Sequence, residues 1–297
     1  MKRIIRVFPR RTRATPNDNL VAVARRPGFF DEADEVHISV TFTYDMPYAE
    51  RLARVWKTVA PVKIGGPATG ERSEEFVPGM YLKHGYTITS RGCPNKCWFC
   101  SVWKREGKPR ELAIVRGWNI LDDNLLACSK DHIQNVFSML SKQLIRPVFT
   151  GGLEAARLKD WHINELVRIK TQRMYFAYDT MDDYEPLQAV VKPLVESGLM
   201  AGHKIGVYCL IGFPGDTIPE ASRRLLDVYD LGYTPYAMLW MDDKMGEVDK
   251  EWRGFQRVWA RPICIYRHAW PSKKRILFPK TRSHPLLRNK HLNFGKF

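Results

Sequence analysis

From residue 85 onward, short apolar segments alternate with amphipathic ones, and this alternation constrains the fold more than any other feature. Six segments rich in β-branched and aromatic residues predict strands: YTITS (86–90), WNILDDN (118–124), RPVFTGG (146–152), MYFAYDT (174–180), KIGVYCLIG (204–212) and PYAMLWMDD (235–243). Helical segments are expected between them, at about residues 129–143, 160–170, 183–197 and 218–231. Strands separated by helices pair in parallel through right-handed crossovers. The sequence therefore predicts an α/β fold that closes as an open or complete β/α barrel.

A smaller strand–helix–strand unit is expected before this region. EVHISVTFT (35–43) and PVKIGGP (61–67) have strand character, and the segment between them (45–60) carries apolar residues on one helical face. Together they predict a small βαβ unit. A boundary near residue 80 divides the chain into three parts. These are a basic arm plus the βαβ unit (1–80), the strand–helix region (81–245) and a basic, aromatic C-terminal extension (246–297).

The net charge of +15 is concentrated at the two ends of the chain. Residues 1–26 carry +7 and residues 267–297 carry +9, whereas the residues between them sum to −1. Such ends could bind a polyanion such as a nucleic acid, or they could be solvated tails. No run of about 18 apolar residues is present, so no membrane span is expected. The few, clustered cysteines suit a reducing cytoplasm, where we expect the protein.

Three of the six cysteines lie in GCPNKCWFC (92–100), directly after the first strand of the strand–helix region. Cys93, Cys97 and Cys100 are therefore expected on a loop at the carboxyl end of that strand, where β/α barrels carry their active sites. Three interpretations compete. The cysteines could hold three irons of a [4Fe–4S] cluster and leave the fourth open to a small molecule. They could bind zinc with a fourth ligand, or they could be thiols without a ligand.

The C-x3-C-x-aromatic-C spacing, with Phe99 as the aromatic residue, resembles the signature of the radical S-adenosylmethionine (SAM) superfamily. TSRG (89–92) and LIGFPGDT (210–217) resemble the branch whose members often carry an N-terminal cobalamin-binding domain. The resemblance covers roughly residues 80–245 and implies a partial (β/α)6 barrel. It also implies SAM on the open iron, its reductive cleavage to a 5′-deoxyadenosyl radical, and hydrogen abstraction from a substrate. A flavodoxin- or ferredoxin-type protein would supply the electron.

The resemblance also implies residues that bind SAM. In TGGLEA (150–155), Gly151 and Gly152 match the element that contacts the SAM amino group, with the acid one place late at Glu154. A carboxylate suits an ammonium group, and glycines let the backbone approach a ligand. The remaining residues of this set are expected near the ribose, the methionine carboxylate or the adenine: Phe99, Asp179, Thr180, Gly212 and Pro214. Asp179 and Thr180 could instead cap a helix, and Gly212 and Pro214 could simply turn the chain.

Other family features are missing or ambiguous. The N-terminal unit resembles a truncated cobalamin-binding fold but lacks a D-x-H-x-x-G motif around His37, so cobalamin is not expected. Cys128 is expected to pack, and Cys209 could point into the barrel. Either Cys209 or Cys264 could donate a hydrogen atom to a radical or could simply pack in the core. These three share no ligand spacing, which argues against a second cluster. Residues 238–244 could line the substrate side of the barrel, and residues 259–270 could plug its open mouth.

The sequence thus predicts a radical SAM enzyme with a [4Fe–4S] cluster. Its substrate is unidentified and could be a small anionic or nucleotide-like molecule, and no catalytic side chain is assigned. The alternative is a non-catalytic, metal-stabilised nucleic-acid-binding protein, which the basic ends and a zinc reading of the cysteines would favour.

Overall fold

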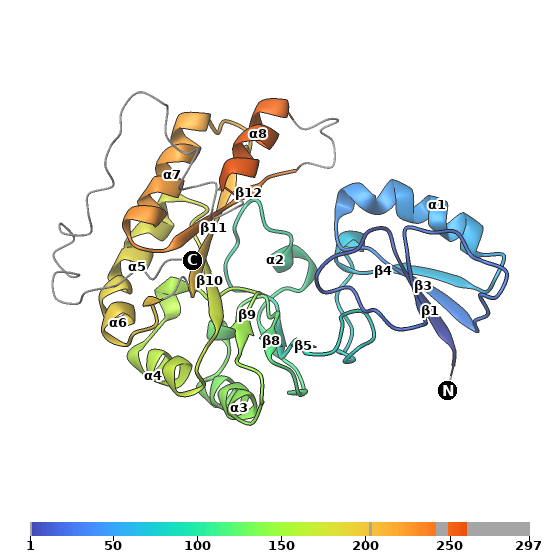
Figure 1. Ribbon diagram of the computed structural model, residues 1–297, viewed down its shortest axis with the longest axis horizontal. Coiled ribbons are helices and arrows are strands. Elements are labelled where there is room, and N and C mark those ends of the chain that lie inside the picture. Colours follow the sequence, from blue (N-terminus) through green and yellow to red (C-terminus); the bar gives the residue numbers. More distant parts are fainter. Residues whose placement is uncertain (1, 202–203, 242–248, 260–297) are drawn as a thin grey trace, which may run out of the picture.

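Two parallel β-sheets, each with its own hydrophobic core, make up the molecule (Figure 1). The computed structural model describes residues 2–201, 204–241 and 249–259. The larger sheet belongs to the strand–helix region and the smaller one to the N-terminal part. A third pairing, β6 (Ser90–Arg91) with β7 (Arg110–Glu111), is antiparallel and two residues long. The predicted α/β class is confirmed.

The six strands of the larger sheet stand in the order β12-β11-β10-β9-β8-β5, so each strand lies beside its neighbours along the chain. All five pairings are parallel, and β5 and β12 form the two edges. The strands are β5 (Tyr86–Thr87), β8 (Asn119–Ile120), β9 (Val148–Phe149), β10 (Arg173–Ala177), β11 (Ile205–Ile211) and β12 (Thr234–Leu239). Each predicted strand segment contributes one of them, although the first three pair over two residues only.

Helices α3 to α7 lie along one side of this sheet, and α8 packs beside β12 and α7 (Figure 1). They are α3 (Lys130–Ser141), α4 (Asp160–Arg168), α5 (Tyr184–Ala189), α6 (Val191–Glu196), α7 (Ile218–Asp230) and α8 (Lys250–Trp259). Ser129 and Thr217 cap α3 and α7, because their hydroxyl oxygens accept backbone N–H groups of the first turn. The single helix predicted over 183–197 is instead two helices that meet at Val190. Pro193, just after this break, lacks the N–H that a continuous helix would need.

The two faces of the larger sheet differ. Met174, Phe176, Val207 and Cys209 point toward the helices and are at most 1% exposed, in one continuous core. The alternate residues of the same strands point the other way, toward the side on which α2 (Val102–Arg105) and the N-terminal unit lie (Figure 1). We call this second side the open face.

The smaller sheet has the order β2-β1-β3-β4, with all strands parallel. Its elements are β1 (Ile4–Phe8), β2 (Val21–Val23), β3 (Glu35–Ser39), α1 (Met46–Trp56) and β4 (Val62–Gly65). The predicted strand–helix–strand unit corresponds to β3, α1 and β4. The expectation of a basic arm before it was wrong, because Ile5 and Val7 are buried and β1 is a central strand.

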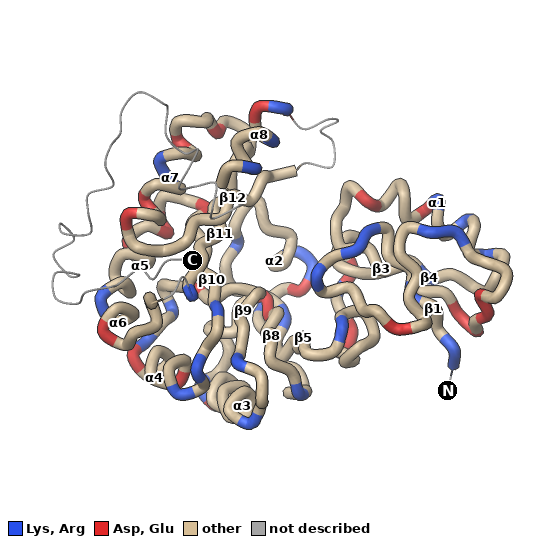
Figure 2. The backbone as a smooth tube through the Cα atoms, viewed as in Figure 1, with Lys and Arg blue, Asp and Glu red and all other residues tan. Residues whose placement is uncertain are grey.

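The basic residues of this N-terminal part lie among acidic ones (Figure 2). Arg6 is buried, ion-paired with Asp18, and donates to the main-chain oxygens of Gly79 and Met80 at 2.9 and 3.0 Å. Five further pairs are Lys2–Glu35, Arg3–Glu32, Arg10–Asp45, Arg25–Asp31 and Lys63–Glu35. Much of the local excess of positive charge is therefore matched within the fold. The other basic end, 267–297, lies outside the described residues.

Short 3-10 turns complete the described structure: η1 (Thr43–Asp45), η2 (Pro67–Thr69), η3 (Leu125–Ala127), η4 (Ala155–Arg157) and η5 (Met181–Asp183). Among the described residues, the helices are too short and too polar for any of them to cross a membrane.

Candidate functional site

The predicted cysteine loop lies between β6 and β7, so its two ends are clamped by a short antiparallel pairing. Gly92 begins the loop with a φ of 89°, and a Cβ there would lie 2.4 Å from the carbonyl oxygen of Lys108. Only glycine fits that position without a shift of backbone. The N–H of Cys93 then donates to the carbonyl of Gly107 across the base of the loop at 3.2 Å. The loop therefore leaves the sheet at a fixed point.

The three cysteines on this loop are free and half-buried. The N–H of Cys100 donates to the carbonyl of Cys97 at 3.1 Å, and the indole of Trp103 donates to the same carbonyl at 2.9 Å. Burial, followed by the charges of Cys100 and Cys93, raises the pKa of Cys97 to about 11. Burial and the charge of Cys93 also raise the pKa of Cys100, although the Val102 N–H opposes that rise. Thiolates of Cys97 and Cys100 would therefore be costly without a bound cation.

Thiolates are the donors that iron–sulfur clusters and zinc take in proteins, so the chemistry of this set fits either group. Across residues 2–201, 204–241 and 249–259, however, no three His, Cys, Asp or Glu side chains are grouped so that they could hold a metal ion.

Cys93 is linked to the predicted glycine–glycine–acid element through Asn124. The Asn124 amide nitrogen lies 3.4 Å from the Cys93 sulfur and 2.7 Å from Oε2 of Glu154. Arg157 donates to the same Glu154 oxygen at 2.5 Å. The carbonyl oxygen of the Asn124 side chain is buried and has no hydrogen-bond partner in the protein. Asn124 was not singled out from the sequence, although it ends a predicted strand and so falls at the same edge.

Gly151 and Gly152 bring the chain close to the strand before them. A Cβ on Gly151 would lie 2.2 Å from the carbonyl oxygen of Asp122, and Gly152 has a φ of 90°. Both positions therefore need glycine for backbone reasons alone. The chain after this turn places Glu154 at the edge where Cys93 lies, and Asn124 contacts both side chains.

Asp179, at the end of β10, also lies near the cysteine loop, because its charge contributes to the raised pKa of Cys97. Its Oδ1 accepts the N–H of Leu210 at 2.9 Å. Burial raises the pKa of Asp179 to about 7, against that hydrogen bond. Thr180 is the N-cap of η5, and Oδ2 of Asp183 accepts the N–H groups of both Asp179 and Thr180. The capping alternative thus describes Thr180, whereas the Asp179 carboxyl points to the neighbouring strand.

Gly212 and Pro214 form a turn that closes on itself. Gly212 has a φ of 70°, and its N–H donates to Oδ2 of Asp216 at 2.8 Å. Arg224 donates to both oxygens of Asp216, at 2.9 and 2.8 Å, and holds that carboxylate in place. Pro214 is exposed. The turn therefore has a structural use that needs no ligand.

Through Trp98, the cysteine loop contacts residues that follow β11 and β12. The ring centroid of Trp98 lies 5.4 Å from that of Phe99, 5.5 Å from Phe213 and 6.4 Å from Trp240. Phe213 and Trp240 closely follow β11 and β12, so the loop reaches from the first strand to the last two. Trp98 is nonetheless 53% exposed. One edge of the sheet thus gathers the cysteine loop, Glu154, Asp179 and the Gly212 turn.

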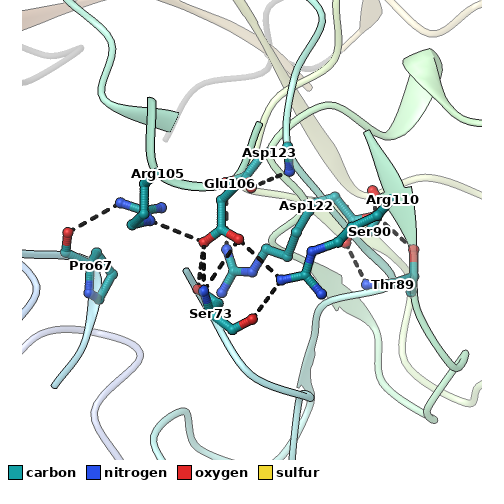
Figure 3. Close-up of polar contacts among 11 residues, drawn as sticks. Pro67, Ser73, Thr89, Ser90, Arg105, Glu106, Arg110, Asp122 and Asp123 are labelled. Carbon is teal, nitrogen blue, oxygen red and sulfur yellow. Dashed lines mark hydrogen bonds and ion pairs between the residues drawn. The ribbon is translucent and has the colours of Figure 1, made fainter. Parts of the chain in front are cut away.

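Two aspartates behind the loop anchor its start (Figure 3). Asp122 is buried and accepts the N–H and hydroxyl of Thr89 at 2.7 and 2.6 Å, and the hydroxyl of Ser90 at 2.7 Å. Asp123 accepts the Gly92 N–H at 2.9 Å. These aspartates belong to the predicted strand 118–124, but no local pattern indicates their partners more than 30 positions earlier.

Glu106 ties the end of the cysteine loop to the segment that follows the smaller sheet (Figure 3). Its buried carboxylate accepts the Ser73 hydroxyl at 2.5 Å and the guanidinium groups of Arg105 and Arg110 at 3.0 and 3.1 Å. Arg110 also donates to the Ser73 carbonyl. Burial acts to raise the pKa of Glu106, but these hydrogen bonds outweigh it and hold the pKa at about 2.

The remaining cysteines lie away from this edge. Cys209 is fully buried on the helix side of β11, so the expectation that it points into a barrel was wrong. Cys128 is half-buried and packs against the same core, as predicted. Cys264 and the segment 260–270 lie outside the described residues, as does 242–248. In β3, both ring nitrogens of His37 contact protein groups, Tyr81 at 2.6 Å and Glu35 at 3.0 Å.

No protein-family model matches the chain, and no curated protein matches it in sequence. A function is therefore inferred from the residues and their arrangement.

Proposed function

We propose that the chain is a radical SAM enzyme in which Cys93, Cys97 and Cys100 hold a [4Fe–4S] cluster. One observation carries the proposal: three free thiols, spaced as in that superfamily, share a clamped loop at the strand edge that also bears Glu154 and Asp179. Three cysteines supply three of the four irons and leave one position for a small molecule. Six parallel strands in chain order suit a partial (β/α)6 barrel around such a site.

The residues of this edge would divide the binding of SAM among them. Glu154 would take the amino group, since a carboxylate pairs with an ammonium ion, and Asn124 and Arg157 orient it. Asp179 would accept ribose hydroxyls, and Phe99 and the Gly212–Pro214 turn would border the adenine. When bound, the cluster would supply one electron for the cleavage of SAM to a 5′-deoxyadenosyl radical. A flavodoxin- or ferredoxin-type protein would reduce it.

The test is anaerobic reconstitution of the full chain with iron and sulfide, followed by metal analysis and incubation with SAM and dithionite. The wild-type chain is expected to bind about four irons and to release 5′-deoxyadenosine. Cys97→Ala is expected to lose most of the iron and all of the cleavage, because the cluster would keep only two thiolates.

Cys128→Ala is the matched control, since it removes a half-buried thiol outside the loop and is expected to keep both properties. Zinc at one per chain without iron would contradict the proposal and favour a structural metal site. So would cleavage that is unchanged in Cys97→Ala.

A further inference from the structure

One arginine of the larger sheet, Arg173, forms no ion pair with a carboxylate of the described residues. Within the described residues, four arginines have a buried ε-nitrogen without a hydrogen-bond partner: Arg6, Arg110, Arg173 and Arg224. Three of these four pair with a carboxylate, on Asp18, Glu106 and Asp216 respectively. No carboxylate of the described chain pairs with Arg173. A half-buried guanidinium without a counter-ion is costly, so its retention calls for an explanation.

Three tyrosines on adjacent strands, Tyr175, Tyr208 and Tyr236, form what we call the tyrosine layer. Arg173 begins β10 and contacts Tyr175 and Tyr236. One terminal nitrogen of Arg173 donates to the Tyr236 hydroxyl at 2.5 Å. The guanidinium lies 5.6 Å from the ring centroid of Tyr175 and 5.8 Å from that of Tyr236. Tyr175 and Tyr208 stack with centroids 4.7 Å apart and planes 3° from parallel. The rings stabilise the cation but carry no net charge that would neutralise it.

The tyrosine layer lies on the open face of the sheet, away from the helices. On the same face, the exposed Ala177 lies in register with Tyr208 and Tyr236, and Met238, which is 47% exposed, lies two residues further toward the carboxyl end of β12. Asp179 follows two residues after Ala177, beside the cysteine loop. Four residues of extended chain span about 13 Å. A molecule about that long could therefore lie with one end on the tyrosine layer and the other near the cysteines.

A second cation approaches the layer from the smaller sheet. Arg13 lies just beyond β1, at the carboxyl edge where the strand order of that sheet reverses between β1 and β3. Burial raises the pKa values of Tyr175 and Tyr208, and the positive charges of Arg173 and Arg13 oppose that rise. Arg13 is exposed, and within the described residues it forms no ion pair. Figure 2 shows a basic loop of the smaller sheet turned toward the larger one.

We propose that Arg173, Arg13 and the tyrosine layer form a binding site for a planar anionic molecule, a ring that carries a phosphate or carboxylate group. The ring would stack on the half-buried Tyr208 and Tyr236, and the anionic group would take the two unmatched guanidinium groups. That this ligand is the substrate rests on the proposed function, whereas its binding does not depend on the cluster.

Binding is tested on the full chain by titration calorimetry with AMP and UMP as ring phosphates and 4-hydroxybenzoate as a ring carboxylate. Adenosine, uridine and inorganic phosphate are the matched partial ligands. At least one ring anion is expected to bind more tightly than its uncharged or ringless counterpart. Arg173→Gln is expected to weaken that binding about tenfold or more, the usual effect of losing a charge-assisted hydrogen bond.

Arg13→Gln provides a second variant at an exposed position, where folding is not at risk, and a several-fold loss is expected. Arg168→Gln, which removes an exposed arginine paired with Glu165 on α4, is the control and is expected to bind normally. Arg173→Gln is also expected to keep the melting temperature, whereas Arg224→Gln, which strands the Asp216 carboxylate, is expected to lower it.

The proposal fails if no ring anion binds the wild-type chain better than inorganic phosphate does, or if both Arg173→Gln and Arg13→Gln bind as the wild type. The Cys97→Ala chain separates this outcome from failure of the cluster proposal. Its ring-anion binding is expected to persist even when iron is lost.

Discussion

At the scale of single residues, Gly92 shows how a glycine can fix where a functional loop starts. Its positive φ and the close carbonyl of Lys108 leave no room for a side chain. Gly107, at the other end of the loop, has a φ of 75°, but a Cβ added there would meet no atom within 4 Å, so this glycine serves conformation alone. A side chain at Gly107 would therefore cost only backbone strain, whereas a side chain at Gly92 would cost backbone strain and a steric clash.

Gly107→Ala is expected to lower the free energy of unfolding by about 1 kcal/mol, the cost of a left-handed conformation for a residue with a Cβ. Gly92→Ala is expected to cost more, because the added carbon would meet main-chain oxygen as well. Urea unfolding of the two variants and the wild type checks the order. Equal losses of unfolding free energy would mean that the backbone near Gly92 shifts to accommodate a Cβ without a further cost.

At the scale of elements, the well-packed strands and capped helices were the most predictable features. β10, β11 and β12 are long, apolar and flanked by turn residues, and Ser129 marks a clear start to α3. β5 and β8 are shorter than predicted because side chains replace the backbone hydrogen bonds between strands. The N–H of Thr89, for example, donates to the Asp122 carboxylate. The core strand β1 was not predicted, because the many Lys and Arg residues around it indicated a basic arm.

The candidate site was predictable only in part. The cysteines, Glu154 and Asp179 each follow a predicted strand, and parallel strands bring such positions to one edge. Asn124 and the contact of Glu106 with Ser73 were missed because these partners lie about 30 positions away, and local patterns carry no such information. The direction of Cys209 was wrong because KIGVYCLIG is apolar at nearly every position, so its alternation does not reveal which face is buried.

Glu106 joins two elements, the end of the cysteine loop and the segment around Ser73, and its loss is expected to destabilise both. Glu106→Gln leaves Arg105 and Arg110 without their carboxylate and is expected to cost about 3 kcal/mol at pH 7. The pKa of Glu106 is lowered by folding, so its contribution is present above the unfolded value of 4.5 and is lost as the pH falls toward about 2.

Urea unfolding between pH 7 and pH 2 measures this dependence. The variant is expected to lose less stability than the wild type below pH 4.5. Glu165→Gln, at an exposed pair with Arg168, is the control and is expected to change stability by about 0.5 kcal/mol or less. A Glu106→Gln chain as stable as this control would show that the buried network contributes little.

At the scale of the whole molecule, the two sheets have separate cores that are joined by polar contacts such as those of Glu106 with Ser73 and of Arg105 with Pro67. Leu52 lies in the smaller core and Leu166 in the larger one, and both are at most 3% exposed. Polar links between two cores transmit less cooperativity than shared apolar packing would.

Leu52→Ala is therefore expected to raise hydrogen exchange in peptides from β1, β3 and β4 while peptides from α3 and α7 stay protected. Leu166→Ala is expected to do the reverse, and each change should cost about 2–5 kcal/mol in its own core. Mass spectrometry of deuterium uptake distinguishes the two patterns. If either variant exposed both sets of peptides equally, the chain would be one cooperative unit.

The order of the strands has a consequence for how the protein is made. A ribosome releases amino-terminal residues first, and the smaller sheet is complete once Gly65 has emerged. In the larger sheet, each strand after β5 pairs with the strand that was synthesised before it, because the spatial order follows the chain order. Assembly of the larger sheet can thus keep pace with translation, and at each stage its unpaired edges are β5 and the strand added last.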